Sequence, residues 1–283
     1  MENPWVARRS LNYAHQGGAR EGPSSTIHAM RRAVEVGAHA IELDVHATAD
    51  GELVVCHDAT VDRTTDGTGR IADLTWSEIR RLDNAFWWVP DRVVDHEAAP
   101  DDYVLRGRAA EDPDLRIPLL REVLRTFPDT YLNLDIKQTA PVVEPYEALL
   151  AGLLREFGRA DDVIVASFSD DATAAFAACA PEVSTAAGTN ATAAFYFAVT
   201  QGEKPPATTH HALQVPPAFG GIPVVDDRFV AAAHAHGLAV HVWTIDEAPE
   251  MAALLDLGVD GVMTDRPSVL AEVLRRRGRP AVR

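Results

Sequence analysis

The chain has 283 residues, of which 47% are hydrophobic, and its formal net charge is -16 at pH 7. This length and composition suffice for one large α/β barrel or two smaller domains, and they argue against disorder. The negative charge argues against nucleic acid and anionic membrane surfaces as general partners. Two cysteines, Cys56 and Cys179, do not make a disulfide framework, and we find no pattern typical of a signal peptide or a membrane span. We therefore expect a cytoplasmic protein with no stable membrane insertion.

The first elements predict a β-loop-α-β unit. Residues 11–15 are expected to form a short strand that ends in Gln16-Gly17-Gly18, and Thr26 is placed to cap a helix over 26–37. A strand that begins at Ile41 follows this helix. Strands joined through a helix run parallel, so the unit predicts a parallel sheet.

The segment 84–116 interrupts this pattern, after a helix start predicted by Thr75 and Glu78. It holds Phe86-Trp87-Trp88, three prolines and many charges. It is longer than a barrel connection needs, and long loops in compact domains tend to be functional. We expect an inserted loop that covers the functional site. The alternative is an ordered surface excursion with a small apolar core of its own.

Strand and helix patterns then alternate to the end of the chain. Strands are expected near 131–137, 163–167, 183–187, 211–215, 238–243 and 260–264, and helices near 118–126, 142–158, 170–179, 189–201, 226–236, 247–257 and from Pro267. The count is about eight βα units, which is the number in a (β/α)8 TIM barrel. The sequence therefore predicts one barrel domain over residues 1–283, with the insertion at 84–116.

Two carboxylates share one face of the second predicted strand. Successive side chains on a strand point to opposite faces, so Glu42, Asp44 and His46 lie on one face and apolar residues lie on the other. Buried carboxylates cost free energy unless a partner pairs with them. A hard cation such as Mg²⁺ or Ca²⁺ would do so. The alternatives are a solvated face or a salt bridge to Lys or Arg.

Other chemistry-bearing residues also fall at predicted strand ends, where the sites of such barrels lie. His15 ends the first strand, and His57 follows an extension of the second. Asp135 and Lys137 share one face of the third strand with Asn133, and Trp243 shares a face with His241. Three carboxylates, two histidines and one lysine are the parts of metal-assisted hydrolysis or phosphoryl transfer.

At these residues the chain resembles the glycerophosphodiester phosphodiesterases. The match covers nearly the whole chain apart from 84–116 and 190–225. It rests on Ala14-His15-Gln16-Gly17-Gly18, Ile41-Glu42-Leu43-Asp44-Val45, Val54-Val55-Cys56-His57-Asp58-Ala59-Thr60-Val61-Asp62-Arg63-Thr64-Thr65, Asn133-Leu134-Asp135-Ile136-Lys137, Val242-Trp243-Thr244 and Gly258-Val259-Asp260-Gly261-Val262-Met263-Thr264-Asp265.

The resemblance implies a hydrolase of small-molecule glycerophosphodiesters that releases an alcohol and glycerol 3-phosphate and uses one divalent cation, Ca²⁺ or Mg²⁺. It implies that three acids bind the metal, namely Glu42, Asp44 and Asp135. The two histidines, His15 and His57, are then the acid/base pair. It also implies that Gln16 and Lys137 contact the phosphate and that Trp243 lines the substrate pocket.

Two departures from the family pattern leave other functions open. Gln16 replaces the usual Arg and brings no charge to the phosphate. Residues 23–26, Pro-Ser-Ser-Thr, lack the acid that the family carries there. The alternatives are a lysophospholipase D-like enzyme, in which Phe86, Trp87 and Trp88 hold an acyl chain, and a catalytically silent phosphodiester-binding barrel.

Overall fold

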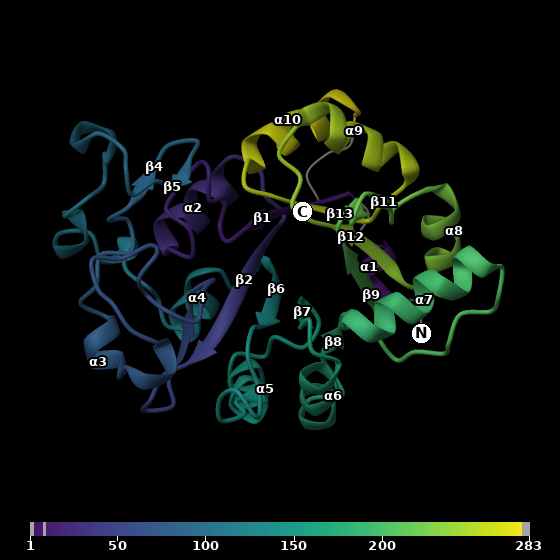
Figure 1. The fold of residues 1–283 in the computed structure, drawn as a ribbon, viewed down its shortest axis with the longest axis horizontal. Coiled ribbons are helices and arrows are strands. Elements are labelled where there is room, and N and C mark those ends of the chain that lie inside the picture. Colours follow the sequence, from purple (N-terminus) through teal and green to yellow (C-terminus); the bar gives the residue numbers. More distant parts are fainter. Residues whose placement is uncertain (1–2, 8–9, 279–283) are drawn as a thin grey trace.

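The computed structural model describes residues 3–7 and 10–278, and the described chain forms a barrel of eight parallel strands surrounded by helices (Figure 1). The barrel strands are β1 (Leu11–His15), β2 (Ala40–Ala47), β6 (Tyr131–Ile136), β7 (Val163–Ala166), β8 (Ser184–Thr185), β9 (Ala212–Val215), β12 (Ala239–Val242) and β13 (Gly261–Thr264). Their order around the barrel is β8-β7-β6-β2-β1-β13-β12-β9. A bridge between Ala186 and Ala212 joins the two ends. The predicted fold class is therefore confirmed.

The larger helices lie outside the strands. They are α2 (Ile27–Glu35), α4 (Leu120–Thr126), α5 (Glu147–Glu156), α6 (Asp170–Cys179), α7 (Thr189–Gln201), α8 (Asp227–Ala235), α9 (Ala248–Leu257) and α10 (Pro267–Arg276). The predicted cap of α2 is confirmed, because the Thr26 hydroxyl accepts a hydrogen bond from the amide of Ala29 at 3.1 Å. Glu78 likewise accepts from the amide of Thr75 at 2.8 Å, at the start of the short α3 (Trp76–Ile79).

Local chain chemistry explains where the observed elements differ from the predicted ones. Helix α5 begins at Glu147 instead of near 142, because Pro145 disfavours a helical conformation in the residue before it. The extension of the second strand folds back as β3 (Leu53–Val55), which pairs antiparallel with β2. Strand β8 is only two residues long, and the hydrogen bond from His211 N to Thr185 O helps to join it to β9.

The barrel interior is closed at the amino ends of its strands. The short helix α1 (Pro4–Ala7) contacts β12 and places Trp5 fully buried among residues from the strand starts, including Leu11 and Ala40. Larger apolar clusters fill the layer between the strands and the surrounding helices. Side chains that fill this closed end leave the carboxyl ends of the strands as the open end.

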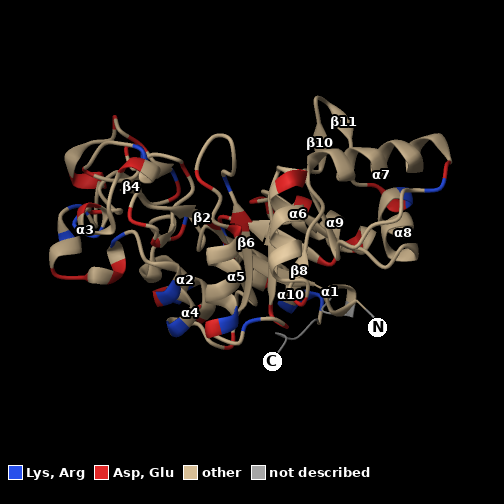
Figure 2. Cartoon of the chain, turned by 90° about the horizontal axis from the view of Figure 1, so that it is seen from below, with Lys and Arg blue, Asp and Glu red and all other residues tan. Residues whose placement is uncertain are grey.

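Two excursions rise on opposite sides of the barrel (Figures 1 and 2). The insertion at 84–116 holds β4 (Trp88–Val89), β5 (Val93–Val94) and three short 3₁₀ helices, η2 (Pro100–Asp102), η3 (Arg108–Ala110) and η4 (Pro113–Leu115). Near α7 on the other side is a hairpin of β10 (Ala218–Phe219) and β11 (Ile222–Pro223). Within the described residues, no helix is both long enough and apolar enough to cross a bilayer.

The turn after β1 gives a testable consequence for stability. Gly18 has φ +90°, and a Cβ there would lie 2.9 Å from the Cδ atom of Pro267. We expect Gly18→Ala to lower the free energy of unfolding by about 1–3 kcal/mol, because the left-handed backbone and the close contact both oppose a side chain. Urea denaturation followed by circular dichroism measures this change.

Gly152, on the exposed face of α5, is the matched control. A Cβ there meets nothing within 4 Å, and its φ is not positive. Gly152→Ala is expected to raise the free energy of unfolding by about 0.5–1 kcal/mol, because alanine favours the helix. Equal effects of the two substitutions would contradict the assigned role of the turn.

Candidate active site

A cavity of about 690 Å³ opens at the carboxyl ends of the barrel strands. This volume is in the range of small-molecule sites, roughly 300–1,000 Å³. Its polar half is lined by His15, Glu42, Asp44, His57, Asn133, Asp135 and Lys137. Trp243 lines the other half, so seven of the eight predicted site residues surround one space. The eighth, Gln16, lies outside this lining.

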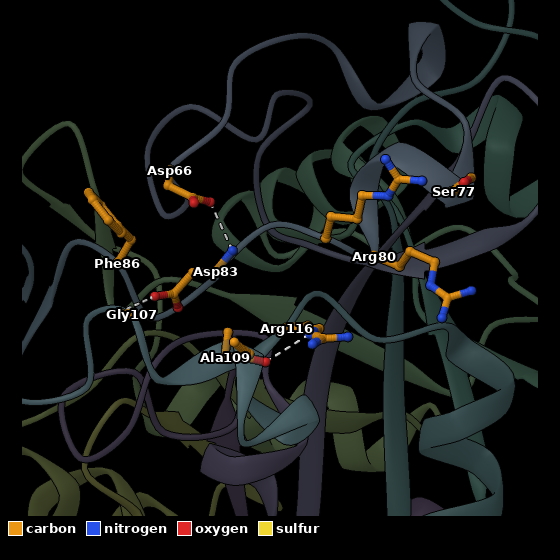
Figure 3. Close-up of a pocket in the computed structure, with 10 residues that line it drawn as sticks. Asp66, Ser77, Arg80, Asp83, Phe86, Gly107, Ala109 and Arg116 are labelled. Carbon is orange, nitrogen blue, oxygen red and sulfur yellow. Dashed lines mark hydrogen bonds between the residues drawn. The ribbon is translucent and has the colours of Figure 1, made fainter.

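A second cavity, of about 540 Å³, lies within the insertion and the segment before it (Figure 3). The carboxylate of Asp66 accepts a hydrogen bond from the amide of Asp83 at 2.9 Å, and that of Asp83 accepts from the amide of Gly107 at 2.6 Å. Arg116 donates to the carbonyl of Ala109. These polar side chains of the second cavity are bonded to backbone groups and hold the insertion together. We therefore place the candidate active site in the cavity at the strand ends.

Three carboxylates from the adjacent strands β2 and β6 form the centre of the polar half. Asp44 lies opposite Asp135 in the register of the two strands, and Glu42 lies opposite Asn133. All three acids are buried. Burial raises the pKa of each carboxyl, that of Asp44 to about 7, because the charged form loses its water. These acids therefore need a nearby cation to remain ionised.

Lys137 supplies such a cation. Its Nζ lies 3.0 Å from Asp44 Oδ1 and 3.3 Å from Asp135 Oδ2. Burial alone would lower the pKa of Lys137, but the charges of these two carboxylates raise it above its usual range. The second oxygens, Asp44 Oδ2 and Asp135 Oδ1, are buried and have no hydrogen-bond partner among the described residues. Buried acceptors of this kind are rare in folded proteins and mark a place for a ligand.

The donor set fits a hard divalent cation by its chemistry. Carboxylate oxygens are the ligands that Mg²⁺ and Ca²⁺ prefer, and the two aspartates that carry the unpaired oxygens both line the cavity. Among residues 3–7 and 10–278, no group of three His, Cys, Asp or Glu side chains is already arranged around a metal position. The ammonium of Lys137 lies between Asp44 and Asp135 and contacts the other oxygen of each, Asp44 Oδ1 and Asp135 Oδ2.

His15 is held at the end of β1 by Asp265. Its Nδ1 lies 2.7 Å from Asp265 Oδ1, and its Nε2 lies 3.8 Å from Glu42 Oε2. Burial alone would lower the pKa of His15, but the hydrogen bond with Asp265 and the charge of Glu42 outweigh it and raise this pKa to about 9. In this arrangement the imidazole is protonated at neutral pH.

His57 has a similar acidic partner from its own loop. Its Nδ1 lies 2.6 Å from Asp58 Oδ1, and Arg63 donates to both oxygens of Asp58 at 2.5 and 3.1 Å. The ion pair fixes the carboxylate, which in turn orients the ring. The ring centres of His15 and His57 are 6.4 Å apart, and both rings line the cavity.

The two predicted substrate contacts differ in position. Gln16 is buried, and its backbone amide donates to Glu42 Oε2 at 3.2 Å while its side-chain nitrogen lies 3.3 Å from His15 Nε2. Its φ of 52° turns the chain in the left-handed region at this point. Trp243 follows β12 and meets the ring of Phe168 edge-on, with 5.7 Å between ring centres. Contact of either residue with substrate stays a prediction.

The insertion lies beside the site and contributes no lining residue to the 690 Å³ cavity in the described chain. The indole nitrogen of Trp87 donates to the carbonyl of Thr65, and that of Trp88 donates to the carbonyl of Ala19, both at 2.9 Å. These bonds fasten the insertion to the loops that follow β1 and β3. The hypothesis that Phe86, Trp87 and Trp88 hold an acyl chain in this cavity is therefore not supported, and coverage of the site by the insertion stays a prediction.

Sequence reasoning missed two polar residues around the site. Asp265 holds His15, and Gln214 Nε2 donates to Asn133 Oδ1 at 2.6 Å inside the barrel. Asp265 stands directly after the last barrel strand, which is the same signal that singled out the other acids. Its partner, however, is 250 residues earlier. The pairing of β1 with β13 brings the two together.

A closed (β/α)8 barrel with acids and histidines at the carboxyl ends of its strands has the architecture of the barrel enzymes. The glycerophosphoryl diester phosphodiesterase family model matches residues 15–269. The chain belongs to this family, as the resemblance indicated.

Known proteins agree with this assignment. A glycerophosphodiester phosphodiesterase of Caldanaerobacter subterraneus is 30% identical over 278 residues, which cover 95% of this chain and 100% of the relative. The crystal structure of a glycerophosphodiester phosphodiesterase from Agrobacterium tumefaciens has a TM-score of 0.68 at 25% identity and covers 93% of this chain and 99% of its own. An Oleispira antarctica phosphodiesterase, solved with the product sn-glycerol-3-phosphate, shares the fold with a TM-score of 0.68 at 19% identity, over 96% of this chain and 99% of its own.

The raised pKa of His15 gives a prediction for the EDTA-treated protein. We expect this imidazole to remain protonated at pH 7.5. Its folded-state pKa of about 9 is above its ordinary value of 6.5, so its stabilising effect is full below pH 6.5 and is lost as the pH rises through 9. Asp265→Asn should lower the pKa, because the negative charge at Nδ1 is removed. Histidine ¹⁵N chemical shifts recorded against pH measure both values.

His241 is an internal control in the same spectra. It is fully buried between aromatic rings, and burial lowers its pKa to about 3. It should stay neutral across the titration in both proteins. An unchanged His15 curve in Asp265→Asn would show that Asp265 does not hold the proton of His15.

Proposed function

We propose that the protein is a metal-dependent phosphodiester hydrolase that acts on glycerophosphodiesters and releases an alcohol and glycerol 3-phosphate. The observation that carries this proposal is the set of buried carboxylates with unpaired oxygens, Asp44 and Asp135, beside two histidines that each have a carboxylate partner. Family membership supports the substrate class. The product bound in the Oleispira antarctica phosphodiesterase is consistent with the same products here.

One divalent cation, Ca²⁺ or Mg²⁺, would be held by Glu42, Asp44 and Asp135. When bound, it supplies positive charge that polarises the phosphoryl group and balances the negative charge developing on it. Lys137 contacts two of these carboxylates, those of Asp44 and Asp135. We propose that the substrate phosphate is the anion with which its ammonium pairs once the carboxylates have another partner. Lys137 is thus assigned to the phosphate and the acids to the cation.

The two histidines are proposed to move the protons. His15 is protonated at neutral pH in this arrangement, which suits a general acid that gives a proton to the leaving alkoxide. His57 then takes a proton from the nucleophile, which is water or the hydroxyl next to the ester on the substrate's glycerol. Asp265 and Asp58 hold the Nδ1 atoms, so the Nε2 atoms are the ones available to the reacting groups.

Gln16 leaves the phosphate without the Arg that the family usually places there. Its backbone amide holds Glu42, a contact that needs no charged side chain. Lys137 and Trp243 remain in the cavity as candidate substrate contacts. The retained acids and histidines favour an active enzyme over a silent phosphodiester-binding barrel. A cytoplasmic location stays a prediction from the sequence.

Removal of metal tests the role of the acids. We expect treatment with EDTA to abolish release of glycerol 3-phosphate from sn-glycero-3-phosphocholine, and Ca²⁺ or Mg²⁺ to restore it, because three buried acids lose their cation. Calorimetric titration of the same ions should show binding to the wild type and none to Asp44→Asn. Full turnover in the presence of chelator would contradict metal dependence, and absence of turnover with every cation would favour the silent barrel.

Substitution of His57 tests the proton transfer. His57→Ala is expected to lower kcat by about 100-fold or more, because the nucleophile loses its base. The exposed His236, which follows α8 and does not line the cavity, is the control, and His236→Ala should leave kcat within about two-fold of wild type. Circular dichroism confirms that both variants are folded. Turnover in His57→Ala close to that of the wild type would remove His57 from the mechanism.

A further inference from the structure

Two side chains of the insertion, Trp87 and His96, are bonded to the loop that carries His57. The imidazole of His96 donates from Nε2 to the backbone carbonyl of Arg63 at 3.0 Å, because a carbonyl oxygen can only accept. The indole of Trp87 donates to the carbonyl of Thr65 at 2.9 Å. Both acceptors belong to the loop after β3, so the insertion holds this loop at two points.

The two side chains support each other. Their rings are stacked, with 4.5 Å between ring centres and 19° between ring planes. The backbone between them is also held, since the amide of Asp95 donates to the carbonyl of Trp87 and the carbonyl of Asp95 accepts from the hydroxyl of Tyr103. A lone exposed imidazole would exchange this hydrogen bond freely with water. The stacking restricts the ring and directs Nε2 toward the loop.

Trp87 is fixed in turn by Arg106 from the far part of the insertion. The guanidinium carbon of Arg106 lies 4.6 Å from the centre of the Trp87 ring and 3.4 Å from that of Tyr103. Its Nε also donates to the carbonyl of Phe86 at 2.8 Å. A cation over an aromatic face is attracted to the ring, so these contacts fix the tryptophan from within the insertion.

The residue that His96 holds leads directly to His57. Arg63 donates to both oxygens of Asp58, at 2.5 and 3.1 Å, and Asp58 Oδ1 lies 2.6 Å from His57 Nδ1. A two-pronged ion pair of this kind tolerates little displacement of either partner. A shift of the Arg63 backbone therefore moves the guanidinium and, through the carboxylate, the ring of His57.

We propose that His96 and Trp87 are positioning residues for His57, and that the insertion acts in the reaction by holding this ring in place. The inference rests on the proposed function, in which His57 takes a proton from the nucleophile. Neither His96 nor Trp87 lines the active-site cavity. Their loss should therefore slow the chemical step and leave substrate binding unchanged, because proton transfer depends on the placement of the reacting groups.

Turnover of sn-glycero-3-phosphocholine with saturating divalent cation is the first test. His96→Ala should lower kcat by about three- to ten-fold, the effect of one lost hydrogen bond, and leave KM within about two-fold of wild type. His96→Gln keeps a side-chain N–H at similar reach and should restore kcat. Trp87→Phe keeps a ring but loses its N–H, and it should lower kcat by a similar factor.

A double-variant cycle tests the route through Arg63. Arg63→Ala removes the ion pair with Asp58, so nothing connects His96 to His57 in that background. His96→Ala should then lower kcat by less than about two-fold further. Losses that multiply in the double variant would show that His96 does not act through Arg63, and they would overturn the inference.

Proton exchange at His57 gives a readout that needs no turnover. In the EDTA-treated protein, the Nδ1 proton of His57 lies in the hydrogen bond with Asp58. Its exchange with water, measured by ¹H–¹⁵N NMR, should be faster in His96→Ala than in the wild type, because a looser ring opens more often. The Nδ1 proton of His15, held by Asp265, should exchange equally in both and is the internal reference.

His236 is the matched control. Its Nδ1 lies 2.8 Å from the carbonyl of Ala232, and its ring meets Phe195 edge-on with 5.7 Å between ring centres. It is exposed and makes the same kinds of contact as His96, but it does not bond the loop after β3. His236→Ala should leave kcat and the exchange at His57 unchanged. Equal changes in His96→Ala and His236→Ala would overturn the inference.

The outcomes separate this inference from the function on which it rests. No turnover in the wild type with any cation, or full turnover in His57→Ala, overturns the proposed function. Wild-type kcat in His96→Ala, with the loss in His57→Ala retained, keeps that function and overturns the positioning role. A raised KM with unchanged kcat would place His96 in contact with substrate and also overturn it. Equal exchange at His57 in the wild type and His96→Ala overturns it whatever the turnover.

Discussion

The contacts of Lys137 with Asp44 and Asp135 determine the character of this active site. The register of β2 and β6 places two acids side by side at the open end of the barrel, and Glu42 is buried one layer below. Burial alone favours their neutral forms, so the charge of the site depends on a cation among them. The lysine meets this need in part and leaves one oxygen of each aspartate unpaired. A divalent cation and a phosphate could together satisfy all of these groups.

Each of the two histidines is oriented toward this centre by a carboxylate partner of its own. Asp265 holds His15 and Asp58 holds His57, each through Nδ1, so the two rings approach the same space from different sides. The apolar lining of the cavity comes from a different part of the chain, from Phe168 after β7 to Trp243 just after β12. The polar and apolar sides of the cavity therefore come largely from separate loops of one barrel.

Much of the fold could be predicted because it depends on local patterns. The cap at Thr26, the alternation of strands and helices, and the shared face of Glu42 and Asp44 all follow from residues close in sequence. The same rules could also have predicted that α5 starts only after Pro145, but its start was predicted too early, near residue 142. The β10–β11 hairpin was missed because its strands are two residues long and give no periodic signal.

The sequence by itself determined which residue types stand at strand ends and, through the spacing of two, which of them share a face. Only the tertiary structure decided which of them meet. Asp265 reaches His15 because β1 pairs with β13, and Lys137 turns back to Asp44 because β2 pairs with β6. It also decided that the exposed aromatic residues near the cavity come from α7, the hairpin and the segment after β7, and not from Phe86-Trp87-Trp88. Closure of the barrel brings together residues far apart in sequence, and no local periodicity records those contacts.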